Sequence, residues 1–260
     1  MPWLEGFYLT PFLIFTFVLA RVSGLVMTAP TFTGTYVPMQ VRAFLAIGIA
    51  LILMPTQLRA PLDAPGNLSD YAILLAGELL IGVVLGMGIA TLAAGLQLAG
   101  QVIAQMSGMA LADVLNPGSD NEVPIFASML YMVGLAVFVV IGGHRALIDA
   151  LMGTFAAIPI GHGAAVGSLG ETVSTLMAES FALGLRAAAP AMVALLLATL
   201  VLGLIGRTLP QLNVLVLGFG INSLITLAAL FVSVGAVAWL FQEYFDPALK
   251  TLLDGLTRTG

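Results

Sequence analysis

Long uncharged apolar runs alternate with short polar or proline-containing breaks along the chain. A helix needs about 20 apolar residues to cross roughly 30 Å of hydrocarbon, so these runs predict membrane-spanning helices. We expect an all-α polytopic membrane protein with about six long helices and broken helical hairpins, forming a single domain over residues 1–260. The runs lie at residues 7–27, 42–58, 71–95 with a helix-compatible continuation to 115, 123–142, 170–207 and 214–242, with a short helix ending near Ile158 and Pro159 and a weakly amphipathic tail after 242.

Composition strengthens the membrane interpretation and narrows the function. The chain is 60% hydrophobic and 8% charged, whereas soluble proteins average about 25% charged residues. Its net charge of −5 supplies no basic field for nucleic acid. Zero cysteines exclude disulfides, thiolate metal sites and cysteine nucleophiles. The opening MPWLEGFYL has no basic n-region, so we expect the first apolar segment to be retained rather than cleaved.

Enzymatic chemistry is not indicated by the motifs. No Ser/His/Asp set, P-loop or GxGxxG occurs in a suitable context. His144 and His162 are the only histidines, and a haem or zinc site needs more ligands than two such imidazoles offer. Capping or turn roles are favoured for both. We therefore predict no catalytic residue, no metal site and no cofactor.

Three ionisable residues, Arg21, Glu78 and Arg186, fall inside apolar stretches. Each would cost about 2.5–3.5 kcal/mol at the centre of a bilayer, so each needs a partner. Glu78 has two interpretations. In the first, it is a proton or ion carrier of a transporter. In the second, which we favour, it has a structural position, either paired with an arginine or near a membrane interface.

Small residues recur at helical spacing, and Gly82 and Gly86 form a GxxxG pattern. Such a pattern lets two helix backbones approach closely where lipid supplies no hydrophobic drive. Packing within the chain is favoured over contact with another subunit.

The segment QMSGMALADVLNPGSDNEVP, residues 105–124, interrupts the apolar pattern. Just before it, Gln97, Gln101 and Gln105 are four residues apart, which places their amides on one helix face that must meet protein or water. Met106 and Met109 are either adaptable core filler or a deformable seal.

A series of short motifs follows one order along the chain. They are ARVSGLVMTAPTF with Pro38 and Arg42, GELLIG at 77–82, AGQVIAQMSG at 99–108, NP at 116–117, GH at 143–144, TFAAIPIG at 154–161, LGLIGRTLPQLN at 202–213 and LGF at 217–219. Their order resembles the FliR/SctT family of type III secretion export-apparatus proteins over most of the chain. Departures from the family pattern occur at Ser107, Asn116 and Gly220, where the family often has Met, Asp and Pro.

The resemblance implies one copy of this subunit in a helical export gate with FliP-like and FliQ-like subunits and an FlhB-like switch protein. Unfolded flagellar or virulence proteins would leave through it. The expected location is the bacterial inner membrane, at a flagellar basal body or an injectisome base. By resemblance, the segment near 106–124 would project into the channel and help to plug it, with Met106, Gly108, Met109, Asn116, Pro117 and Gly118 as its key residues.

Two other interpretations stay open on the sequence. A small secondary transporter would have a midplane site at broken helices near residues 105–116 and 207–213. A scaffold subunit would differ from the gate only in whether residues 106–124 line a channel.

Overall fold

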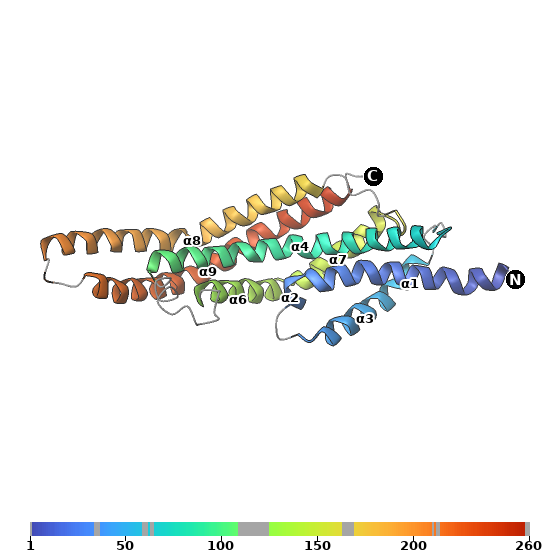
Figure 1. The fold of residues 1–260 in the computed structure, drawn as a ribbon, viewed down its shortest axis with the longest axis horizontal. Coiled ribbons are helices and arrows are strands. Elements are labelled where there is room, and N and C mark those ends of the chain that lie inside the picture. Colours follow the sequence, from blue (N-terminus) through green and yellow to red (C-terminus); the bar gives the residue numbers. More distant parts are fainter. Residues whose placement is uncertain are drawn as a thin grey trace. The chain divides into compact units, whose positions relative to one another are not determined.

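The computed structural model describes residues 2–33, 37–58, 62, 65–108, 125–162, 169–209, 211 and 214–257. Every regular element in these ranges is a helix, which confirms the all-α prediction (Figure 1). The helices are α1 (Pro2–Thr28), α2 (Pro30–Thr33), α3 (Met39–Gln57), α4 (Leu68–Ser107), α6 (Ile125–Val140), α7 (Gly143–Ala157), α8 (Leu169–Thr208) and α9 (Val214–Thr257).

Helix length and apolarity confirm a multi-pass membrane protein. Four helices, α1, α3, α4 and α8, are long and apolar enough to cross a membrane. Two broken pairs of shorter segments, α6 with α7 and two parts of α9, raise the number to six if each pair makes one span. The short helix predicted after residue 143 is α7, which ends at Ala157, directly before Ile158.

Two helices, α4 and α9, have C-terminal ends far from the predicted residues. α4 is one 40-residue helix that ends at Ser107, short of the predicted continuation to residue 115. It ends there because Gly108 takes a left-handed conformation (φ +80°) and its N–H bonds the Gln105 carbonyl at 3.2 Å. α9 continues to Thr257 through the expected tail, because the tail's apolar residues at three- and four-residue spacing bury one helix face. Those residues are Phe245, Ala248, Leu252 and Leu256.

The chain divides into two compact units. Unit 1 comprises Met1–Thr91, Gly142–Leu176 and Asp246–Gly260, and unit 2 comprises Leu92–Ile141 and Met177–Phe245. Three long helices, α4, α8 and α9, contribute a segment to each unit.

Unit 1 is built on the close approach of α1 and α4. A methyl group at Gly82 would overlap the Arg21 carbonyl, and one at Gly86 would overlap the Thr28 hydroxyl. A methyl group at Gly24 would likewise meet the backbone of α4. The GxxxG pattern therefore packs within the chain, and α3 covers another side of α1.

Unit 2 uses small residues in the same way. Gly95 of α4 lies against Ser180 and Gly184 of α8, and Gly100 lies against the backbone of α6 at Ala127. Aromatic packing adds an edge-to-face contact between Phe138 of α6 and Phe245 of α9, whose ring centroids are 5.5 Å apart.

Candidate functional site

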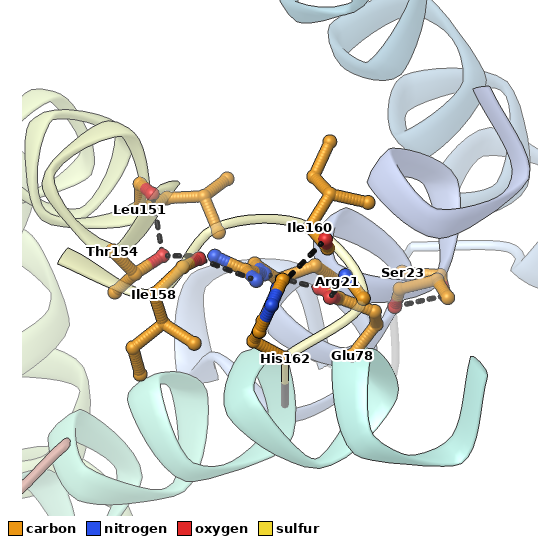
Figure 2. Close-up of polar contacts among 10 residues, drawn as sticks. Arg21, Ser23, Glu78, Leu151, Thr154, Ile158, Ile160 and His162 are labelled. Carbon is orange, nitrogen blue, oxygen red and sulfur yellow. Dashed lines mark hydrogen bonds and ion pairs between the residues drawn. The ribbon is translucent and has the colours of Figure 1, made fainter. Parts of the chain in front are cut away.

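The polar centre of unit 1 is an ion pair between Arg21 on α1 and Glu78 on α4. Arg21 Nε donates to Glu78 Oε2 at 2.6 Å, and both side chains are fully buried (Figure 2). Glu78 lies one helical turn before Gly82, and Gly24 follows Arg21 by three residues. The glycines that bring the two backbones together therefore also bring the charges together.

The rest of the guanidinium contacts α7 and the turn that follows it. Nη1 lies 3.1 Å from Thr154 Oγ1, and Nη2 donates to the Ile158 carbonyl oxygen at 3.2 Å. The Arg21 Cζ atom lies 4.2 Å from the centroid of the Phe155 ring, a cation–π distance. The Thr154 hydroxyl also donates to the Leu151 carbonyl at 2.6 Å, so it accepts from the arginine.

The second carboxylate oxygen is held by the same turn. The Gly161 N–H donates to Glu78 Oε1 at 3.0 Å. Gly161 has φ +85°, a left-handed conformation that glycine adopts without strain. His162, just beyond, bonds the backbone of this turn, with Nδ1 3.3 Å from the Ile160 carbonyl oxygen. The cluster therefore ties α1, α4 and the end of α7 together (Figure 2).

The electrostatics of this cluster favour a structural role. A buried ion pair is tolerated when its charges compensate and hydrogen bonds satisfy the remaining donors and acceptors. Both oxygens of Glu78 accept a hydrogen bond, one from a guanidinium and one from a peptide N–H. Pairing with an arginine is thus the arrangement that the structure contains, and the geometry favours a tie between three segments over an ion carrier.

The third predicted intramembrane charge, Arg186, belongs to unit 2. Arg186 is exposed on the unit 2 segment of α8, and its Cζ atom lies 5.6 Å from the Tyr244 ring centroid. Sequence reasoning missed the partners from α7 and its turn, Thr154, Ile158 and Gly161. The motif TFAAIPIG marked that segment, but no spacing rule linked it to Arg21.

The predicted plug segment is described only at its start. Gln97 and Gln101 are half-buried on α4 and Gln105 is exposed, so this face is open to other groups at the C-terminal end of the helix. Met106 is half-buried and Gly108 ends the helix. Met109, Asn116, Pro117 and Gly118 lie outside the described residues.

Metal binding finds no support in the described part of the chain. No group of three or more histidine or acidic side chains there is placed to hold a metal ion.

Comparisons with known proteins cover nearly the whole chain. The family model described as bacterial export proteins, family 1, matches residues 12–248. The chain is 29% identical to the flagellar biosynthetic protein FliR of Escherichia coli (strain K12), over 91% of this chain and 90% of that protein. It is 27% identical to the proteins of the same name from Caulobacter vibrioides, over 92% and 94% of the two chains, and Bacillus subtilis, over 95% of each.

Proposed function

Because the chain belongs to the bacterial export proteins of family 1, as its motifs predicted, we propose that it is a core subunit of a protein export gate. It forms part of the channel that passes unfolded proteins across the bacterial inner membrane. Relatives that share 27–29% of its residues over about nine-tenths of their length are named flagellar biosynthetic proteins, which favours a flagellar basal body as its location.

The proposed partners are FliP-like and FliQ-like subunits and an FlhB-like switch protein. Support comes from the lengths of α4, α8 and α9, which have 40, 40 and 44 residues. At 1.5 Å per residue α4 and α8 are each about 60 Å long, roughly twice the thickness of the hydrocarbon layer, and α9 reaches its length in two parts that are bent relative to each other. Lipid covers only part of each helix, so neighbouring subunits are needed to cover apolar surface beyond it.

The observation that carries the channel role is the polar end of α4. Gln97, Gln101 and Gln105 follow one helix face to the left-handed Gly108, after which the 109–124 segment begins. Amides on an otherwise apolar helix must meet protein or water, and a channel wall offers both. The segment that starts at Met106 is proposed to close the channel at rest and to move during export.

Deletion of residues 116–121 tests the plug. In an assembled gate we expect greater ion leakage through the resting channel and altered secretion, measured by conductance of the inner membrane and by exported protein in the medium. A replacement of the same six residues by a glycine-serine linker of equal length is the control for chain length. Unchanged leakage and secretion after the deletion would refute the plug.

Co-purification tests the gate itself. A tagged copy isolated from native membranes is expected to bring several copies of FliP-like and FliQ-like proteins, identified and counted by mass spectrometry. A lone, monodisperse protein that gains thermal stability from a small solute would instead support the transporter.

A further inference from the structure

Three glutamines form an uncharged polar row along α4 in unit 2. Gln97, Gln101 and Gln105 are four residues apart, and each step turns the helix by only about 40°, so their amides follow one face. The same face carries Ala94 seven residues before Gln101 and Gly108 seven residues after it. Along its centre, from residue 94 to residue 108, this face therefore presents small side chains and amides.

The amides of this row have hydrogen-bonding capacity that the described residues leave unused. Gln97 and Gln101 are half-buried and Gln105 is exposed. None of the three side chains makes a hydrogen bond with another residue in the described ranges. Each amide offers two N–H donors and a carbonyl acceptor. Because polar groups on so apolar a helix are costly without partners, the row suits a ligand that brings both acceptors and donors.

The spacing of the amides fits the backbone of an extended polypeptide. Four residues of an α-helix rise about 6.0 Å, and two residues of an extended chain rise about 6.6–6.8 Å. Every second residue of an extended chain directs its N–H and its C=O to the same side. An extended chain lying along α4 would therefore bring one such pair of groups to each glutamine in turn.

Two other occupants match the row less well. A helix of a neighbouring subunit has its backbone N–H and C=O groups paired internally, so it reaches the amides only through polar side chains at matching positions. An ionic ligand calls for a counter-charge, and the row offers neutral amides instead. An unfolded chain has free backbone groups along its whole length, whatever its sequence.

We infer that Gln97, Gln101 and Gln105 hydrogen-bond the backbone of an exported polypeptide while it passes in an extended conformation. The inference rests on the proposed function, in which this face lines the channel, and it names the group of the substrate that is recognised. Contact with the backbone makes the row indifferent to the sequence and the charge of the exported chain.

Disulfide mapping tests the position and conformation of the passing chain. The protein has no cysteine, so Gln97→Cys and Gln105→Cys each introduce a single thiol. An export substrate fused to a stably folded domain stalls in the assembled complex, and single cysteines are scanned along its threaded segment. The two thiols are about 12 Å apart along α4, so their best-reacting substrate positions should differ by about four residues in an extended chain and about eight in a helical one.

The control for this mapping is Leu200→Cys on α8, an exposed apolar position, which should give no disulfide above background. An offset of about eight residues, or no substrate disulfide above this control, overturns the inference. A stalled substrate that co-purifies with the complex but reacts with neither thiol overturns it and leaves the proposed function standing. A substrate that stalls without binding the complex would contradict the proposed function and the inference together.

Removal of the amides tests their chemistry. A triple variant with Gln97→Met, Gln101→Met and Gln105→Met keeps unbranched side chains but removes the donors and acceptors. In complexes that assemble normally, we expect the export rate to fall at least about fivefold, the factor for the loss of one hydrogen bond, and alike for substrates of opposite net charge. The matched triple asparagine variant keeps the amides and should retain more of the rate. Unchanged export by the methionine variant, or a loss confined to substrates of one charge, overturns the inference. If the methionine variant fails to assemble, the disulfide offset from the single-cysteine variants decides.

Discussion

Arg21 and Glu78 are 57 residues apart in the sequence, yet their side chains meet at 2.6 Å and both are fully buried. Each remaining contact of the pair comes from α7 or the turn after it. Three segments of unit 1 are therefore joined at one ion pair, in addition to the glycine contacts between α1 and α4.

Removing one charge of the pair should lower the free energy of unfolding far more than removing both. Glu78→Gln leaves the Arg21 guanidinium buried without its counter-charge, so we expect a loss of about 3–5 kcal/mol in the free energy of unfolding. Thermal unfolding of the purified complex measures this loss. The double variant Arg21→Met/Glu78→Gln removes the uncompensated charge and should recover most of the stability. A double variant as unstable as the single one would contradict this account.

The Thr154 hydroxyl should matter because of its oxygen, not its volume. Thr154→Val keeps the shape but leaves Arg21 Nη1 without its acceptor at 3.1 Å, at a cost of about 1–3 kcal/mol. Thr154→Ser keeps the hydroxyl and should lie much closer to the wild type. The same thermal measurement compares them, and equal losses for Val and Ser would assign the effect to packing instead.

Close helix approach predicts a contrast between two glycines. Gly82→Ala would place a methyl group against the Arg21 carbonyl, where backbone must move, so we expect a loss of at least about 1–3 kcal/mol. Gly48→Ala is the matched control, since no atom in the described part of the chain lies within 4 Å of its added methyl group and alanine favours the helix of α3. Subunit abundance in the membrane and thermal stability should decrease in Gly82→Ala and stay at the wild-type level in Gly48→Ala.

Gly108 allows a test at the start of the proposed plug. No atom of the described residues lies within 4 Å of a methyl group added at Gly108, so among them only the backbone conformation, φ +80°, opposes a side chain. A β-branched residue is poorly suited to this conformation and asparagine adopts it more readily. We expect Gly108→Val to lower secretion of export substrates and Gly108→Asn to retain most of it. Equal secretion by both variants would show that the left-handed turn is not needed for export.

The sequence predicted the parts of the fold that depend on apolar length. Runs of apolar residues predicted the main helices, and the end of the short helix was predicted to within one or two residues because Pro159 restricts the chain there. α4 ends at Ser107, where Gly108 turns left-handed, although the residues after it are helix-compatible in composition; residues 109–115 of the predicted continuation lie outside the described residues. The tail was underestimated because its helical face is apolar only at spaced positions.

The site was harder to predict than the helices. The cost of burying a charge in the membrane indicated that Arg21 and Glu78 each needed a partner. That cost can be judged for each residue separately, without knowing the fold. Identifying the partners required the packing of α1 on α4 and the turn at Gly161, and these are long-range contacts across 57 and 83 residues. Two of the contacts use backbone groups, whose positions the residue types do not reveal.

The lengths of α4, α8 and α9 also bear on how a cell handles this protein. A 40-residue helix in a bilayer that covers about 20 residues leaves a chain that is insoluble in water and incompletely sheltered by lipid. A copy made without its neighbours thus presents the signals that membrane proteases and chaperones recognise in orphan subunits. Synthesis must be matched in number and time to that of its neighbours, and surplus copies are expected to be short-lived.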